Sequence, residues 1–312
     1  MPEEGIDLTR KADLLTDHEI LRLSSLLSSH LPPSTMKLRL TGGEPLLHRS
    51  LPSLLSSLRS RVQPRSLGIT TNAILLDRRW DDIKDSITSV NISLDTLDEA
   101  KFVKLTRRKG LGKVLRGIER TGGWSGKVKL NCVVMKGFND KEEDFRSFLN
   151  FQKSTGNDFD VRFIEWMPFD GTGWGESFVP FRGQVETIER AMGEKLVEVA
   201  SDDFNDTTRW FRLQSAPESG GRIGFITSMS ENFCSTCNRV RVTSDGSLKV
   251  CLFDGTEVSL RDAMRDGRDN DDLMQIVNGA LGNKKEKFAG ADDMIDLAAR
   301  VKGNRHMTAI GG

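Results

Sequence analysis

Apolar and polar residues alternate in five short segments along the first half of the chain, at residues 37–41, 67–72, 89–95, 127–134 and 160–167. This period of two predicts β-strands with one polar face. Helical patterns occur at residues 51–61, 77–83, 112–120 and 142–153, and a further one at residues 13–30 contains the capping-box residues Thr16 and Glu19. The repeated strand–helix order predicts a parallel α/β domain.

The polar faces of the predicted strands narrow the fold further. Arg39, Asn91, Lys129 and Glu165 lie on four different strands, whereas a sheet covered on both faces usually shows continuous apolar runs. Any one of them is explained as an ordinary polar residue near a strand end, but the same pattern on nearly every strand favours a polar ligand inside. We therefore predict an incomplete, open-sided parallel (β/α) barrel with its site at the carboxyl ends of the strands.

The second half of the chain is organised differently. Residues 171–175, Gly-Thr-Gly-Trp-Gly, are typical of a boundary loop and divide the chain into a barrel domain, residues 1–175, and a smaller mixed domain, residues 176–312. Helical patterns recur near residues 184–192, 260–265 and 271–281. The charged run at residues 284–287 is typical of a solvated surface.

Composition argues against several classes of protein. The 312 residues carry 45 Lys and Arg and 45 Asp and Glu, so the zero net charge does not indicate nucleic-acid binding, and any anion site must be local. No apolar run is long enough to cross a membrane, and residues 1–5 resemble neither a signal peptide nor a transit peptide. Four cysteines, three of them clustered, do not suggest a disulfide framework, which favours a reducing compartment.

Three of the cysteines indicate a metal site. Cys234 and Cys237 form a CxxC pair, and Cys251 follows a predicted β-hairpin whose turn contains Asp245 and Gly246, so the third thiol returns beside the first two. An iron–sulfur cluster held by three thiolates keeps one iron open for an outside ligand, and this is the first interpretation. Zinc with a distant fourth ligand is the second, and chance clustering the third.

Several motifs, taken together, resemble the GTP 3′,8-cyclase family of molybdenum cofactor biosynthesis, whose members are radical S-adenosylmethionine (SAM) enzymes. The matching segments run in family order along the whole chain: residues 1–5, 39–46, 70–72, 91–95, 106–110, 129–131, 162–170 and 234–241, then Cys251 and the terminal Gly311 and Gly312. Gly-Gly-Glu-Pro at residues 42–45 alone would indicate only some radical SAM enzyme. The cysteine hairpin and the Gly-Gly terminus make the resemblance specific.

The resemblance implies a barrel of the radical SAM type and the first step of molybdopterin synthesis, in which GTP is cyclised to (8S)-3′,8-cyclo-7,8-dihydroguanosine 5′-triphosphate by a SAM-derived radical. It implies no particular catalytic side chain. The implied SAM-binding residues are Gly42, Gly43, Glu44, Pro45, Ser93 and Met167, and the implied GTP-binding residues are Arg39, Thr70, Lys129, Arg239, Val240 and Arg241. A [4Fe–4S] cluster would be held by Cys234, Cys237 and Cys251, and the Gly311–Gly312 tail would enter the barrel.

One departure from the family concerns the beginning of the sequence. Family members carry a CxxxCxxC motif, which holds the second [4Fe–4S] cluster, directly before a segment like residues 1–5, where this sequence begins. We therefore expect a barrel without its first strand and cluster loop, in a truncated or inactive form; the alternative is a non-catalytic homologue that binds GTP and one cluster. The resemblance also implies a homodimer, a downstream cyclic pyranopterin monophosphate synthase as pathway partner, and a location in the cytoplasm or the mitochondrial matrix.

Overall fold

The computed structural model describes residues 9–156, 159–169, 174–201, 203, 206–218, 220–231, 234–285, 288–292, 294–301, 304–305 and 307–310. Within these residues, the main sheet has eight strands in the order β1-β2-β3-β4-β5-β8-β7-β6. They are β1 (Lys37–Leu40), β2 (Ser66–Thr71), β3 (Ser89–Ser93), β4 (Lys127–Val134), β5 (Phe159–Glu165), β8 (Ile223–Ile226), β7 (Arg209–Leu213) and β6 (Leu196–Val199). Neighbouring strands are parallel from β1 to β8, and the pairs β8–β7 and β7–β6 are antiparallel.

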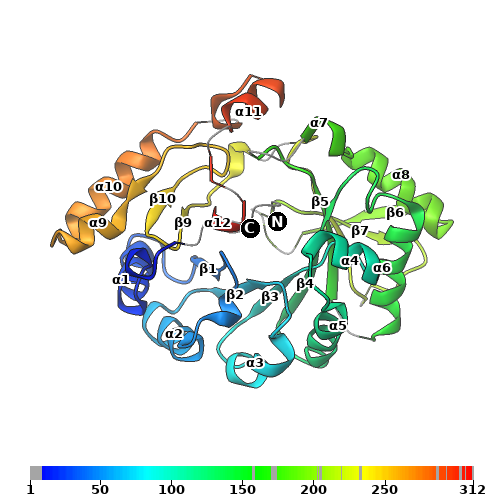
Figure 1. Cartoon of the computed structure of the whole chain (residues 1–312), viewed down its shortest axis with the longest axis horizontal. Coiled ribbons are helices and arrows are strands. Elements are labelled where there is room, and N and C mark those ends of the chain that lie inside the picture. The colour runs from blue at the N-terminus through cyan, green and yellow to red at the C-terminus, as the bar shows by residue number, and fades with distance from the viewer. Residues whose placement is uncertain are drawn as a thin grey trace.

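Each strand from β1 to β4 pairs with the next strand in the sequence, which is the singly wound order of a (β/α) barrel. Figure 1 shows helices around the outside of this sheet. The helices up to β6 are α1 (Asp17–Ser29), α2 (Leu51–Ser57), α3 (Leu76–Ile83), α4 (Glu99–Thr106), α5 (Leu111–Arg120), α6 (Glu142–Ser154), α7 (Trp174–Ser177) and α8 (Phe181–Met192). In the described sheet β1 and β6 are opposite ends that do not pair, so the predicted open-sided, incomplete barrel is confirmed.

The two faces of the sheet differ as the alternating pattern predicts. Along β4, buried residues such as Leu130 and Cys132 alternate with the less buried Lys129 and Asn131. The buried set belongs to the core between the sheet and the outer helices. Since successive residues of a strand point to opposite faces, Lys129 and Asn131 lie on the inner, concave face.

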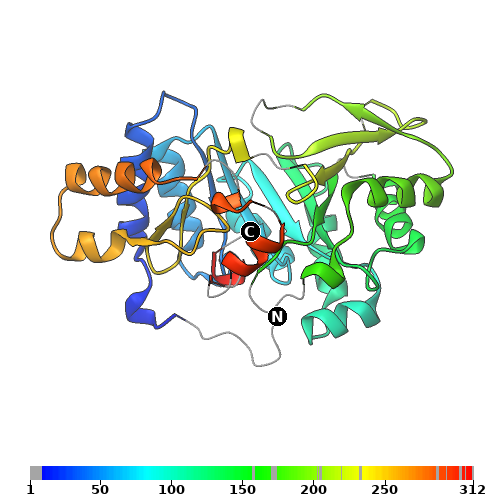
Figure 2. The ribbon, with the colours of Figure 1, turned by 90° about the horizontal axis from the view of Figure 1, so that it is seen from above.

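The chain after β8 returns to the β1 side of the sheet, where Figures 1 and 2 show α9 (Leu260–Arg265) and α10 (Asn270–Gly282) close to α1. Leu23 and Leu26 of α1 share a separate core with Leu260 and Leu273. The predicted capping box is present, because the Glu19 N–H donates to Thr16 Oγ1 and the Thr16 N–H donates to Glu19 Oε2. Arg265 also donates to Glu19, at 2.8 Å, so the same carboxylate connects α1 to α9.

The predicted cysteine hairpin is confirmed in a shorter form. Strands β9 (Arg241–Val242) and β10 (Ser247–Lys249) are antiparallel, and β11 (Val258–Ser259) pairs with the other edge of β10. Gly246 sits in the turn with φ +79°, a left-handed conformation that favours glycine. Residues 239–242 alternate polar and apolar as a strand would, but Arg239 and Val240 precede β9 and are not part of it.

The last elements lie above and within the ring of strands and helices in Figure 1. They are the short turn at Phe288–Gly290, α11 (Met294–Arg300) and α12 (Met307–Ile310). Ile310 is buried with Phe169, Phe253 and Phe288 in a third core. The tail predicted at Gly311 and Gly312 falls outside the described residues. In the described part of the chain, no helix has both the length and the apolar character that a membrane span requires.

Candidate functional site

Polar side chains from four neighbouring strands form one row on the concave face. Thr70 of β2 is paired in register with Asn91 of β3, and Asn91 with Lys129 of β4. Arg162 of β5 donates from Nε to Asn131 Oδ1 at 2.9 Å and from an Nη atom to Asn91 Oδ1 at 3.0 Å. These bonds hold the Arg162 guanidinium against the sheet, with only 6% of the residue exposed.

The cations around this row are close enough to affect one another. Burial, and then the neighbouring Arg39, lower the pKa of Arg162. Burial lowers the pKa of Arg39 as well, with Arg239 as the next cause, although the open concave side leaves part of Arg39 in contact with solvent. Arg241 follows the same pattern, with burial first and Arg239 second. Cations that disfavour one another in this way form a site suited to a multiply charged anion.

Lys129 lies on the same face and contacts an aromatic ring. Its Nζ is 5.4 Å from the centre of the Trp210 ring, and the Trp210 indole N–H donates to Asp206 Oδ2 at 2.8 Å. Burial, followed by the charge of Arg162, lowers the pKa of Lys129 to about 8, while Asp206 opposes the shift. Asp206 is therefore an anion placed among the cations, and it helps to keep Lys129 charged.

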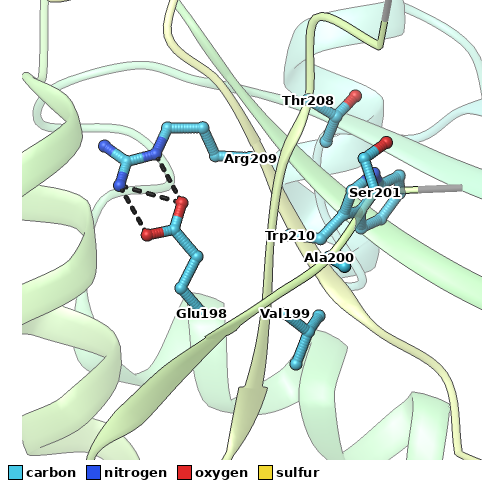
Figure 3. A pocket seen from close by; sticks show the side chains of 7 residues that line it. All are labelled: Glu198, Val199, Ala200, Ser201, Thr208, Arg209 and Trp210. Carbon is cyan, nitrogen blue, oxygen red and sulfur yellow. Dashed lines mark hydrogen bonds and ion pairs between the residues drawn. The ribbon is translucent and has the colours of Figure 1, made fainter. Parts of the chain in front are cut away.

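The packing around Trp210 depends on a glycine in the next strand. A Cβ atom on Gly224 would lie 2.5 Å from Thr208 Cγ2 and 2.8 Å from Trp210 Cζ3. A side chain at this position would therefore displace the ring that Lys129 contacts. Figure 3 shows that Arg209, the preceding residue on β7, points away from Trp210 and pairs with Glu198 beside a shallow pocket.

The residues assigned to SAM gather at the carboxyl-terminal edge of the parallel strands. Gly42 and Gly43 follow β1 with φ +80° and +53°, values that side chains rarely tolerate. Glu44 comes next, and its carboxylate accepts hydrogen bonds from Thr71 Oγ1 at 2.6 Å and from the Asn72 N–H at 2.8 Å. Pro45 starts the short turn Pro45–Leu47, Ser93 ends β3, and Met167 follows β5. This edge is where ligands bind in barrels of this kind.

The three clustered cysteines lie near one another. Cys234 opens the turn Cys234–Thr236, the Cys237 N–H donates to the Cys234 carbonyl at 3.2 Å, and Cys251 follows β10. Burial raises the pKa of Cys234, and the charges of Cys251 and Cys237 raise it further. Cys234 and Cys251 also pack against the core that contains Phe253 and Phe288. Among the described residues, no three His, Cys, Asp or Glu side chains converge closely enough to hold a single metal ion.

Lys284 contacts this group, and the prediction of a solvated surface is wrong for it. The half-buried Lys284 donates from Nζ to the Cys237 carbonyl at 2.7 Å and lies 3.5 Å from Cys237 Sγ. Burial alone would raise the pKa of Cys237, but the Arg239 N–H and the Lys284 ammonium outweigh it and lower that pKa. The adjacent Lys285 is exposed, as predicted, and residues 286–287 lie outside the described residues.

The implied GTP-binding residues are brought together from distant parts of the chain, but not all to the same depth. Thr70 is buried, and Arg39, Lys129 and Arg241 surround the concave face, whereas Val240 is exposed on the approach to β9. The sequence interpretation assigned no role to Arg162, Asp206, Trp210 or Lys284. Of these, only Arg162 had a detectable signal, because it alternates with apolar residues on a predicted strand.

Comparisons with known proteins agree with this arrangement. The family described as Radical SAM superfamily matches residues 5–149, and the family described as Molybdenum Cofactor Synthesis C matches residues 159–290. Together with the singly wound parallel sheet, these matches define the class: a radical SAM protein with a molybdenum cofactor synthesis region at its carboxyl end.

Relatives that match the full length of the chain identify its family more closely. GTP 3′,8-cyclase of Listeria monocytogenes is 36% identical over 322 residues, covering 100% of this chain and 91% of the relative. GTP 3′,8-cyclase, mitochondrial, of Arabidopsis thaliana is 40% identical over 317 residues, covering 100% of this chain and 76% of the relative. The chain therefore belongs to the GTP 3′,8-cyclase family.

Other similarities are less complete. Molybdenum cofactor biosynthesis protein 1 of Mus musculus is 45% identical over 317 residues, covering 100% of this chain but 47% of the relative. The chain thus spans about half the length of several of the curated relatives that it matches. Among solved structures, a radical SAM methyltransferase from Sphaerobacter thermophilus matches with a TM-score of 0.46 and 15% identity, over 57% of this chain and 55% of that one.

Proposed function

We propose that this chain contains the GTP and SAM sites for the first step of molybdenum cofactor biosynthesis, the SAM-dependent radical cyclisation of GTP to (8S)-3′,8-cyclo-7,8-dihydroguanosine 5′-triphosphate. The observation that carries the proposal is a group of cations: Arg39, Lys129 and Arg162 lie on the concave face, and Arg239 and Arg241 lie close enough to affect their pKa values or one another's. The chain as a whole has no net charge, so this concentration is local. Guanidinium groups make directional, charge-assisted hydrogen bonds to phosphate oxygens, which a triphosphate requires.

In this proposal, each group of residues has a distinct task. The cations bind the triphosphate, Thr70 and the segment at residues 239–241 complete the GTP site, and the strand edge with Gly42 to Pro45, Ser93 and Met167 binds SAM. SAM, when bound and reduced by one electron from a [4Fe–4S] cluster, would supply the radical that removes a hydrogen atom from the GTP ribose; the CxxxCxxC motif that holds this cluster in the family is not among the 312 residues. The protein contributes the relative positions of the two ligands.

The cysteines form the third part of the proposed site. Cys234, Cys237 and Cys251 would hold a [4Fe–4S] cluster, which would offer one iron without a protein ligand to the guanine base. Three thiols in one short segment suit a cluster, in which each thiolate binds a different iron and one iron stays open, whereas a structural zinc ion normally takes four protein ligands. The apolar side chains of Phe253 and Phe288 support this, because a hydrophobic surrounding limits the access of solvent to the cluster.

Anaerobic reconstitution with iron, sulfide and zinc all present tests this metal assignment. We expect a brown protein with about four iron and four sulfide ions at this site and no bound zinc. Cys251→Ala should lose the chromophore, whereas Cys132→Ala should keep it, because Cys132 is buried in β4 among core residues. Stoichiometric zinc in a colourless protein would contradict the cluster.

The affinity for GTP is expected to decrease as the pH rises from about 7 to about 9, by roughly tenfold. Lys129, with a pKa of about 8, is charged below that pH and neutral above it, so its attraction to phosphate is lost on the alkaline side. Titration calorimetry with GTP, and with inorganic triphosphate to exclude an effect of the base, measures this change. Lys129→Arg should flatten the profile, since a guanidinium stays charged over this range. Equal pH profiles for the wild type and this variant would remove Lys129 from the site.

The proposal also covers the cellular location of the chain and its partners. The name of the Arabidopsis thaliana relative places that protein in mitochondria, and we propose the mitochondrial matrix or the cytoplasm for this chain. A homodimer and a downstream cyclic pyranopterin monophosphate synthase are the proposed partners. Fractionation of the source cells with an antibody to the chain tests the first point, and light scattering of the purified protein tests the dimer.

A further inference from the structure

One lysine side chain connects the cysteine turn with the segment that carries Arg239. Lys284 lies two residues after α10, and its own N–H donates to the Leu281 carbonyl at 3.1 Å. Helix α10 is fixed in turn, because Leu273 and Val277 are buried in the core shared with α1. The Lys284 side chain therefore extends from a firmly packed element.

The end of this side chain meets three acceptors that lie within three consecutive residues. Lys284 Nζ is 2.7 Å from the Cys237 carbonyl oxygen, 3.4 Å from the Arg239 carbonyl oxygen and 3.5 Å from Cys237 Sγ. An ammonium group has three N–H donors, so one side chain has the donors to serve all three. A guanidinium would not replace it equally, since its donors are fixed in a plane.

The segment that receives these bonds has no helix or strand of its own. Residues 237–240 lie between the turn Cys234–Thr236 and β9, so their carbonyl groups take no part in a regular ladder. The Arg239 guanidinium is bonded at its far end to Thr207 Oγ1, at 2.8 Å. Lys284 therefore bonds to the backbone at both Cys237, a proposed cluster ligand, and Arg239, a proposed GTP-binding residue.

We propose that Lys284 is a positioning residue that sets the Cys237 thiolate and the Arg239 guanidinium at a fixed separation, and that its ammonium also tunes a cluster bound at Cys237. This inference rests on the proposed function for the identity of the cluster and of GTP. The hydrogen bonds from Lys284 to residues 237 and 239 are part of the described structure. A cationic N–H donor near a cluster sulfur stabilises the reduced, more negative state and so raises the reduction potential.

The test compares the wild type with Lys284→Met, Lys284→Gln and, as matched control, Lys285→Met, which removes a neighbouring exposed charge. In the metal-free chain, Lys284→Met should speed amide hydrogen exchange in residues 237–241, because the carbonyl bonds are lost. After loading with iron and sulfide, its cluster should have a lower reduction potential, and its Kd for GTP should rise by about three- to tenfold. Lys284→Gln keeps a neutral donor, so it should lower the potential with less effect on exchange.

Lys285→Met should match the wild type in all three measurements. Wild-type exchange and Kd in Lys284→Met would overturn the positioning role, and equal shifts in Lys285→Met would reduce the effect to general surface charge. If Lys284→Met does not fold, as judged by circular dichroism, the proposal is tested by comparing Lys284→Gln with Lys285→Met. The quantities compared are the reduction potential of the cluster and the Kd for GTP. Failure of the wild type to bind iron or GTP would contradict the proposed function, whereas exchange in the metal-free chain would still test the connection.

Discussion

Arg162→Met is expected to weaken GTP binding by roughly 100-fold, or about 3 kcal/mol, the cost of removing one partner from a buried charged pair. Arg162 is 6% exposed, and in the described part of the chain its hydrogen bonds go to two neutral amide oxygens, those of Asn91 and Asn131. A guanidinium held in this way keeps its charge uncompensated by a directly bonded carboxylate. We infer that a phosphate group of the substrate supplies the missing negative charge.

Titration calorimetry with GTP and with guanosine measures this effect, because only the triphosphate should lose affinity. Arg162→Lys should fall between the wild type and the methionine variant, since it keeps the charge but not both bonds. The matched control is Arg209→Met: Arg209 pairs with Glu198 and Glu231 on the other side of β7, as Figure 3 shows for Glu198. Equal losses for GTP and guanosine would indicate a general structural defect instead of a lost phosphate contact.

Strands β1 to β5 could be predicted because each has one polar and one apolar face, whereas β8, which pairs in parallel with β5, was not predicted. The segment at residues 127–134 alternates throughout, and β4 has those bounds. The antiparallel extension by β7 and β6 had no such signal, because its pairing joins segments that fall outside the strand–helix repeat. Helix α4 is short and buries Phe102 alone, so its periodicity is too weak to detect from the sequence.

Some parts of the candidate site could likewise be predicted from the sequence, and others could not. The cysteine turn and hairpin were predictable because their spacing is local, and the glycines after β1 have the positive φ values that a Gly-Gly pair suggests. Lys284 was not predictable, because the cysteine it contacts is 47 residues away and a charge run by itself indicates only solvent. Asp206 lies in a loop, accepts a hydrogen bond from Trp210 of β7 and helps to keep Lys129 of β4 charged. These three residues come from separate elements, so the sequence gives no sign that they meet. The division at residues 175 and 176 and the ligand assignments remain predictions.

The largest expected loss of stability concerns a carboxylate that binds no ligand in this proposal. Glu165 ends β5 with 1% of its surface exposed, and alternation along β5 places it on the face of Phe163, opposite Arg162, so its predicted position on the ligand-facing side is wrong. It accepts hydrogen bonds from the backbone N–H groups of Phe181, Met229 and Ser230, at 2.8, 2.8 and 2.9 Å, and from the Ser230 hydroxyl. One side chain thus joins the end of β5, the start of α8 and the turn that follows β8.

Glu165→Gln should lower the free energy of unfolding by at least about 3 kcal/mol, because hydrogen bonds to a charged acceptor are worth about 1.5–3 kcal/mol each. The glutamine amide also replaces one acceptor oxygen with an NH2 donor. A buried backbone N–H group would then face another donor and lose its hydrogen bond. Thermal unfolding should show a Tm lower by roughly 6 °C or more. The control is Glu186→Gln on the exposed side of α8, which should stay within about 0.5 kcal/mol of the wild type. An unchanged Tm in Glu165→Gln would mean that these three segments are held together without the carboxylate, and that Met167, two residues further on, is positioned by its apolar contacts alone.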